Sequence, residues 1–402
     1  MGKFFESVRG NLKANPSLSI VVLEGFFARL GFGVITFALP FYALALGMSF
    51  TEIGILAALR LVAAILFKPF MGWAADRFGK KTIYVWSIAG RVLVGVMLVF
   101  ATQPWMLFAI RFFHGITTAA RDPAAAILIA EHGNKDKMAT AFAWYGTARE
   151  VGASVGFLVA GFMLTFTMDN YPATFAFAVF TSIIALFIVA AFVKENKVVN
   201  ETEKTEKKQS ADSAKEKTPW LEYALFGLMA ALTGSMVTNL FPVIATEIGH
   251  ISKAETSIIV TVSTLVIVFA GPWFGWLSDH VSRTLVLSLR AIANAVSSVL
   301  YIFAPTLAGI SAARVCDDAG KAAFRPAWGS LMADISGTRD KRHRGKTIAY
   351  MDTAQSVGEA LGPVIAGLLW DQAGIVWLFG VRLALSVATE LYAVLVLKQH
   401  QN

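Results

Sequence analysis

The stretch Gly72-Trp73-Ala74-Ala75-Asp76 recurs later in the chain as Gly275-Trp276-Leu277-Ser278-Asp279. Other residues repeat at an offset of 202 to 206 positions, namely Pro40 and Pro242, Pro69 and Pro272, Arg111 and Arg314, Gly152 and Gly358, Gly156 and Gly362, and Gly161 and Gly367. The chain is therefore a tandem of two related halves. Two such halves can rock about a central site and expose it to each side of a membrane in turn.

The composition is that of a membrane protein. Hydrophobic residues make up 56% of the chain and charged residues 15%, with a mean hydropathy of +0.61. An apolar helix of about 20 residues crosses a ~30 Å hydrocarbon core, and the chain has twelve such segments. They lie near 17–46, 50–71, 81–102, 104–131, 137–167, 172–193, 219–247, 254–277, 283–303, 305–335, 344–370 and 374–397. Helices satisfy their own backbone polar groups in lipid, so we predict an all-α membrane protein with twelve transmembrane helices in two pseudo-symmetric six-helix halves.

A polar segment separates the two halves. We assign residues 1–193 to the N-terminal half, 194–218 to a cytoplasmic linker and 219–402 to the C-terminal half. The linker is rich in Lys, Glu, Thr and Ser and cannot bury enough apolar surface to fold alone. The only cysteine, Cys316, excludes an intramolecular disulfide.

The net charge of +8 reflects membrane topology. The basic loop residues lie almost entirely on the side of the N-terminus, and Lys253 is the one basic residue in the opposite loops. Cytoplasmic loops carry such an excess of Lys and Arg, so we expect both termini in the cytoplasm. The basic residues do not gather on a folded surface, which argues against nucleic-acid binding.

The stretch from Gly72 to Lys81 closely resembles a loop signature of the major facilitator superfamily, G-x-L-x-D-R-x-G-R-K, with Ala74 in place of Leu. A degenerate copy runs from Gly275 to Arg283. The resemblance covers the full chain and implies a twelve-helix transporter of the bacterial inner membrane. It implies a small-molecule substrate, no cofactor and no enzymatic activity, and we expect a monomer.

In the family this signature latches the cytoplasmic side shut. Glycines allow a tight turn and close helix approach, and acids at other span ends can pair with the basic residues. The resemblance assigns a gating role to Gly72, Asp76, Arg77, Gly79, Lys80, Glu131, Asp279, Arg283 and Asp334. The alternative is that the cations only fix topology.

Span four contains Leu107-x-x-x-Arg111-x-x-His114-Gly115, which resembles a second family motif. In the family a buried arginine at this place is tied to proton coupling, although His114 stands where Gln is common. An arginine inside a span is costly and usually faces a cavity or a partner. A structural ion pair of Arg111 is the alternative.

Charged residues in several spans fall on single helical faces, which predicts a polar interior. Our candidates for substrate binding and proton coupling are Glu24, Arg29, Arg111, His114, Asp317, Asp318, Lys321, Asp352 and Glu359. We interpret the charged residues nearer span ends as snorkelling residues or end contacts, namely Arg60, Lys68, Arg91 and Arg290. A buried acid or a histidine can carry the coupled proton.

The cargo is less determined than the class. Span five contains a segment that resembles the glycine-rich motif of drug and metabolite antiporters, Gly152-x-x-x-Gly156-Phe157-x-x-Ala160-Gly161, with Phe157 in place of the usual Pro. Close helix packing through small residues explains the segment equally well. We expect proton-coupled efflux of an anionic, zwitterionic or amphipathic solute. The alternatives are proton-coupled uptake of an organic anion, a divalent metal transporter using His114, Asp317 and Asp318, and a transporter fold reused as a receptor.

Overall fold

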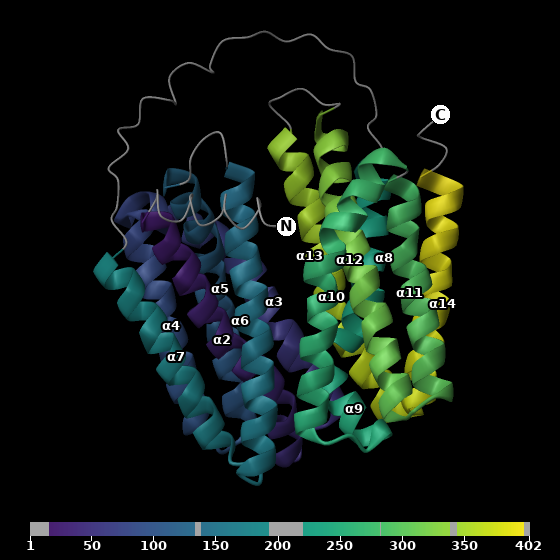
Figure 1. The fold of residues 1–402 in the computed structure, drawn as a ribbon, viewed down its shortest axis with the longest axis horizontal. Coiled ribbons are helices and arrows are strands. Elements are labelled where there is room, and N and C mark those ends of the chain that lie inside the picture. Colours follow the sequence, from purple (N-terminus) through teal and green to yellow (C-terminus); the bar gives the residue numbers. More distant parts are fainter. Residues whose placement is uncertain (1–15, 133–137, 193–219, 282, 338–343, 398–402) are drawn as a thin grey trace.

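The computed structural model describes residues 16–132, 138–192, 220–281, 283–337 and 344–397. Over these ranges the regular structure is helical, as predicted (Figure 1). The N-terminal half contains α2 (Pro16–Ala45), α3 (Phe50–Phe78), α4 (Lys80–Val99), α5 (Pro104–His132), α6 (Met138–Phe166) and α7 (Tyr171–Phe192). The C-terminal half contains α8 (Trp220–Thr238), α9 (Phe241–Gly249), α10 (Lys253–His280), α11 (Arg283–Phe303), α12 (Leu307–Gly337), α13 (Arg344–Ala373) and α14 (Ile375–Tyr392), which ends in the π-helical turn η2 (Ala393–Leu397).

The described helices make the twelve predicted crossings, because α8 and α9 together form one crossing. Its helix breaks at Asn239 and Leu240 and restarts with Pro242 in the first turn of α9, where a proline is well tolerated. Nine described helices are long and apolar enough to span a membrane on composition alone. The linker, 194–218, lies outside the described residues, so its boundaries stay a prediction.

The repeat is visible in how helices begin. Both α3 and α10 start with a capping box, made by Ser49 with Glu52 and by Ser252 with Glu255. In each box the serine oxygen accepts from the third backbone N–H while the glutamate accepts from the serine N–H. The same start in both halves places α3 and α10 at equivalent positions.

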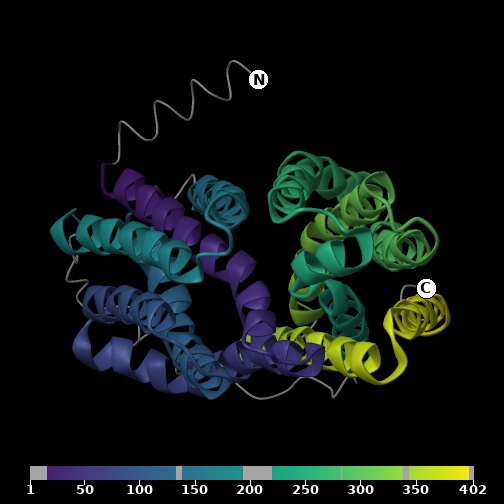
Figure 2. The same ribbon diagram turned by 90° about the horizontal axis from the view of Figure 1, so that it is seen from below.

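The two halves stand side by side (Figure 2), and the apolar packing that they share lies toward one end of the bundle. We call the end that carries Pro16 and Leu397 the terminal end and the other the distal end (Figure 1). One buried apolar cluster, which includes Phe37 and Phe241, extends across both halves toward the distal end. Toward the terminal end each half has its own cluster, around Tyr84 in one and Trp328 in the other. The molecule is therefore closed at the distal end and parted at the terminal end.

Glycines make the close helix contacts within each half. A Cβ on Gly156 would stand 2.2 Å from the Leu30 carbonyl oxygen of α2, and a Cβ on Gly358 would stand 2.2 Å from the Leu228 carbonyl oxygen of α8. The glycine-rich segment of α6 and its copy in α13 thus pack against α2 and α8. This is the packing explanation of that motif.

Candidate functional site

Several cavities lie between the halves, and two of them share Thr238, Asn239, Lys321 and Arg325. One has a volume of about 220 Å³, and the other has a volume of about 120 Å³. Nine helices line them, namely α2, α3, α6 and α8 to α13. The larger is lined by polar side chains that include Arg60, Arg290, Lys321, Arg325, Gln355 and Glu359, and the smaller by Glu150, Arg314, Asp318, Lys321 and Arg325. A cavity with charged walls from both halves is where the sequence predicts a binding site.

Asn239 lines both cavities and also a small third one of about 20 Å³ beside Arg111. It lies in the break between α8 and α9, where the helix is interrupted. Broken helices line binding sites in many transporters. Sequence reasoning missed Asn239, although the nearby Pro242 was a usable signal for a break.

A ladder of charges follows α12 along the cavity wall. The Asp318 carboxylate lies 3.3 Å from the Arg314 guanidinium and 3.3 Å from the Lys321 ammonium. One turn further on, Arg325 extends across the cavity to Glu150 of α6, at 3.1 Å. That ion pair joins the two halves through the site.

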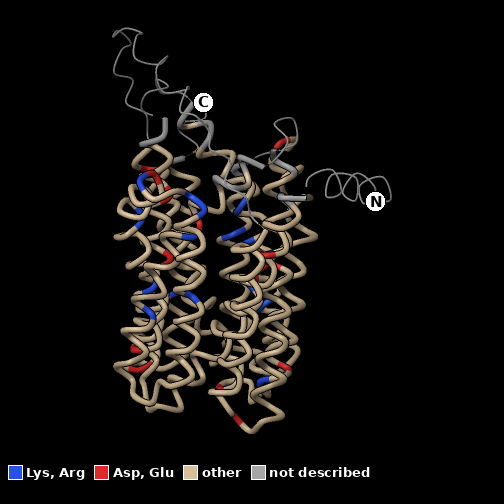
Figure 3. The backbone as a smooth tube through the Cα atoms, turned by 90° about the vertical axis from the view of Figure 1, so that its left-hand side faces the viewer, with Lys and Arg blue, Asp and Glu red and all other residues tan. Residues whose placement is uncertain are grey.

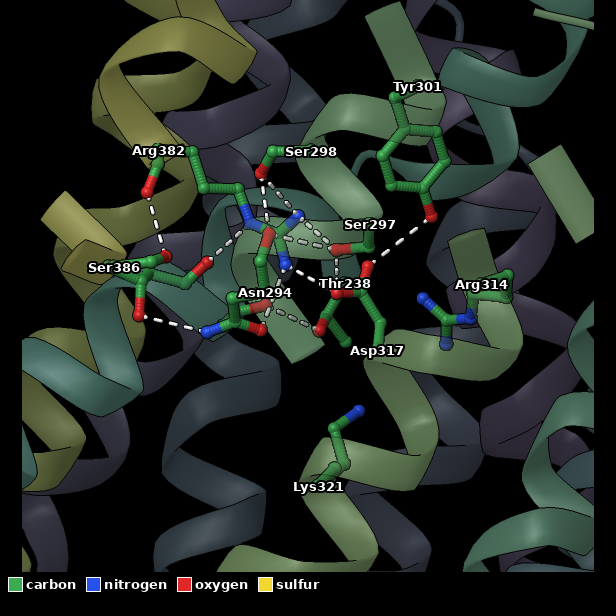
Figure 4. Close-up of polar contacts among 12 residues, drawn as sticks. Thr238, Asn294, Ser297, Ser298, Tyr301, Arg314, Asp317, Lys321, Arg382 and Ser386 are labelled. Carbon is green, nitrogen blue, oxygen red and sulfur yellow. Dashed lines mark hydrogen bonds and ion pairs between the residues drawn. The ribbon is translucent and has the colours of Figure 1, made fainter. Parts of the chain in front are cut away.

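Asp317 belongs to a different network from its neighbour Asp318 (Figure 4). Its carboxylate lies 2.5 Å from the guanidinium of Arg382 on α14 and accepts a hydrogen bond from Ser297 at 2.6 Å. Tyr301 donates a third, at 3.3 Å. Arg382 is fully buried and also donates to Asn294. Sequence reasoning missed Arg382, although a lone arginine in the last span is costly enough to indicate a partner.

Glu24 forms the corresponding buried network in the N-terminal half. Arg121 donates to its carboxylate at 3.0 Å, and the Tyr84 hydroxyl also bonds to it. Glu24 and Arg121 are both 0% exposed. The carboxylate is therefore neutralised within the half and lines none of the cavities described above.

Several arginines lie deeper than the sequence indicated. Arg91 is 3% exposed and Arg290 is 7% exposed, so the interpretation of both as snorkelling residues is wrong. Arg290 donates to the Asp317 carbonyl oxygen at 2.9 Å. Lys68, by contrast, forms an exposed end contact with Asp352 at 3.5 Å, as its position near a span end predicted. Figure 3 shows the charged positions along the helices, mostly nearer the terminal end.

The predicted gating residues lie at the terminal end. Gly79 forms the turn between α3 and α4 with φ of 92°, which a residue with a Cβ rarely adopts. Asp76, Arg77 and Asp279 are exposed, and Lys80 is half-buried. Gly72 has no atom within 4 Å of its Cβ position, so no helix approaches it here. The side chains of Glu131, Arg283 and Asp334 lie outside the described residues.

The distal end is closed by contacts between the halves. The Asp371 carboxylate of α13 accepts from the Thr51 backbone N–H at 2.7 Å and from the Phe50 N–H at 3.2 Å, at the start of α3. At a second contact between the halves, the Thr165 hydroxyl of α6 accepts from the Ala254 N–H at the start of α10. Each half thus supplies an acceptor to a helix start of the other.

The described residues contain no group of three or more His, Cys, Asp or Glu side chains that could hold a metal ion. His114 is completely buried, and Asp317 and Asp318 are each occupied by a basic partner. The three predicted metal ligands do not form such a group in this structure.

Comparison with known proteins agrees with this architecture. The sequence matches the Major Facilitator Superfamily family over residues 21–233 and 223–401. The chain is 24% identical over 403 residues to the quinolone resistance protein NorA of Staphylococcus aureus, covering 96% of this chain and 98% of that one. It is 22% identical over 396 residues to the multidrug resistance protein MdtG of Salmonella arizonae, covering 95% of each. The tetracycline resistance protein, class B, of Escherichia coli matches over about half of each chain, at 27% identity over 195 residues.

Solved structures show the same fold at low identity. The nucleoside transporter NupG superposes with a TM-score of 0.73 at 14% identity, over 96% of this chain and 99% of that one. A bacterial homolog of the human lysosomal transporter Spinster, in an inward-facing and occupied conformation, gives 0.71 at 15% identity, over 94% of each.

Fold, repeat and central cavity define an integral membrane protein with the architecture of a transporter. The chain belongs to the major facilitator superfamily.

Proposed function

We propose that this protein is a secondary active transporter of the bacterial inner membrane that exports a small organic solute in exchange for protons. The observation that carries the proposal is the charged cavity between two halves that are closed at one end and parted at the other. Excess basic residues at the cavity favour an anionic, zwitterionic or amphipathic cargo. The full-length resistance-protein relatives support efflux.

Glu359 is the acid we propose as the proton carrier. It lines the larger cavity, it is half-buried, and the Gln355 amide donates to it at 3.0 Å. The structure records no basic partner for it within 4.0 Å among the described residues, whereas Asp318 and Glu24 are both paired. A carboxylate without a paired cation in a partly desolvated wall can exchange its proton as the cavity opens to each side.

The test is flux in liposomes that carry the purified protein and a pH gradient. Cargo is first identified by a thermal-stability screen of metabolites and drugs. We expect Glu359→Gln to abolish proton-driven accumulation while solute exchange without a gradient continues. Glu247→Gln, which changes an exposed acid of α9 that lines neither cavity, is the matched control. Undiminished proton-driven flux in Glu359→Gln would remove this residue from the mechanism.

The direction of flux separates efflux from the second candidate, uptake of an organic anion. The buried arginines of the N-terminal half favour an anion in either direction. Accumulation of solute on the side that supplies the protons identifies exchange, and accumulation on the opposite side identifies uptake with the proton.

A further inference from the structure

Arginines from three helices surround a single phenylalanine ring in the N-terminal half. The guanidinium carbons of Arg29, Arg60 and Arg91 lie 4.5, 5.5 and 5.6 Å from the centre of the Phe32 ring. The His114 ring meets the same phenylalanine edge-on at 5.6 Å. Arg111 lies one turn before His114 on α5 and donates to the Leu56 carbonyl oxygen. We call Arg29, Phe32, Arg60, Arg91, Arg111 and His114 the arginine cluster.

The charge of the arginine cluster is not neutralised by the protein. Arg91 and Arg111 are 3% and 5% exposed, and the structure records no ion pair between any of the four arginines and another described residue. The neighbouring acids have other partners, since Glu24 and Asp122 both pair with Arg121. Buried charges are costly unless they are paired. The faces of one aromatic ring attract cations but supply no negative charge.

Unused hydrogen-bond donors accompany the unpaired charge. The atoms that are buried without a partner include Nε of Arg29, Arg60 and Arg91, Nη1 of Arg91 and Arg111, and both ring nitrogens of His114. Buried donors are nearly always satisfied in native proteins, so a group of them at one place indicates a missing acceptor.

The other half of the chain shows how the same place is neutralised. At the repeat offset of 203, Arg111 corresponds to Arg314 and His114 to Asp317. Likewise Gly115 corresponds to Asp318, Arg91 to Asn294 and Arg60 to Ser263. In the C-terminal half the two aspartates pair with Arg382 and Arg314. The N-terminal half has more arginines at these positions and has no acid at them.

We infer that the arginine cluster is a binding site for a compact oxyanion, a carboxylate or phosphate group. Guanidinium groups match both in shape and donate two bonds to each. Arg60 lines the larger central cavity, of about 220 Å³, so an anion can approach the arginine cluster from the space between the halves. If the anion is the acidic group of a cargo, the inference rests on the proposed function.

The test measures the melting temperature of the purified full-length protein at constant ionic strength, with chloride as the reference. Inorganic phosphate, acetate and succinate are the probes. A ligand that binds only the folded state raises the melting temperature with saturation. The decisive variant is His114→Asp, which copies its repeat mate Asp317 and supplies the missing charge. We expect it to melt higher than the wild type without anion and to lose the anion-dependent rise.

Lys68→Gln removes one positive charge outside the cluster and should keep the full anion-dependent rise. If His114→Asp does not fold, Arg91→Asn, which copies Asn294, should reduce the rise. Absence of any rise above chloride in the wild type, or an unchanged rise in the folded cluster variant, would overturn the inference. Liposome flux shows where the bound anion comes from. A carboxylate that both binds and is transported is cargo, whereas phosphate that binds without being transported is a resident anion. Anion binding without flux of any solute would defeat the transport proposal and leave the site intact.

Discussion

Asp317 and Asp318 are adjacent in the sequence, yet their carboxylates serve different parts of the molecule. Successive residues on a helix are turned by about 100°, so neighbouring side chains point to different surroundings. Asp318 lines the cavity with Arg314 and Lys321, while Asp317 faces α11 and α14. The sequence places both on one polar stripe. It gives no means of separating them, because the partner of Asp317 lies in another span.

At the residue scale, Asp317→Asn should destabilise the protein by about 3–5 kcal/mol, because it leaves the buried Arg382 charge unpaired. Asp352→Asn breaks the exposed pair with Lys68, in which the two side chains are 51% and 57% exposed, and should cost about 0–1 kcal/mol. Melting temperatures of the two purified variants make the comparison. Equal shifts in melting temperature would show that the buried pair of Asp317 and Arg382 stabilises the protein no more than the exposed pair of Lys68 and Asp352.

The candidate site could be predicted in part. The charged stripe of α12 was readable because its residues recur at helical spacing. The depth of Arg91 and Arg290 was not, because a position near a span end does not say which face of the helix meets the bundle. The nearby Pro242 was a signal for the break at Asn239, but a proline does not indicate which residue leaves the helix or that this residue faces the cavities.

At the scale of elements, the glycines of α6 differ in what surrounds them. Gly156 approaches α2 so closely that an alanine Cβ would overlap the Leu30 carbonyl oxygen, whereas Gly146 has no atom within 4 Å of its Cβ position. One glycine is needed for helix packing, and the other is not. The antiporter motif of α6 therefore has a structural reason at Gly156 whatever the cargo is.

Gly156→Ala should lower the free energy of unfolding by about 1–3 kcal/mol through overpacking against α2. Gly146→Ala should raise it by up to about 1 kcal/mol, since alanine favours a helix interior over glycine. Thermal unfolding in the same detergent checks both. A neutral Gly156→Ala would mean that α2 and α6 can separate at little cost.

At the scale of the whole molecule, the two halves are held together at the distal end. Asp371→Ala removes the acceptor for the first N–H groups of α3 and should shift the molecule toward opening at that end. Bonds to a charged group contribute about 1.5–3 kcal/mol, enough for a shift of about tenfold or more. The reporter is a cysteine at Thr36, beside the cavity, in a Cys316→Ser background.

A thiol reagent that cannot cross the membrane should label that cysteine faster in Asp371→Ala when added from the distal side. Thr165→Ala removes the neutral acceptor at the second contact between the halves. It should have the smaller effect because a hydroxyl accepts more weakly than a carboxylate. Labelling at the parental rate in Asp371→Ala would show that this carboxylate does not hold the halves together.

The fold as a whole was predictable because hydropathy sets the number of spans and the repeat sets their pairing. The repeat does not show where equivalent positions of the two halves have come to differ in function. Equivalent positions of α5 and α12 hold His114 and Asp317, and only the wider packing shows that Asp317 pairs with Arg382 while the arginines around His114 have no ion pair among the described residues.

The start of α3 is capped twice, by its own Ser49 and by Asp371 of the other half. Only the second cap is lost when the halves part. The helix then keeps the serine that is part of its own chain, and water replaces the carboxylate at the freed N–H groups. The contact can therefore be released and remade in every transport cycle without unravelling a single turn.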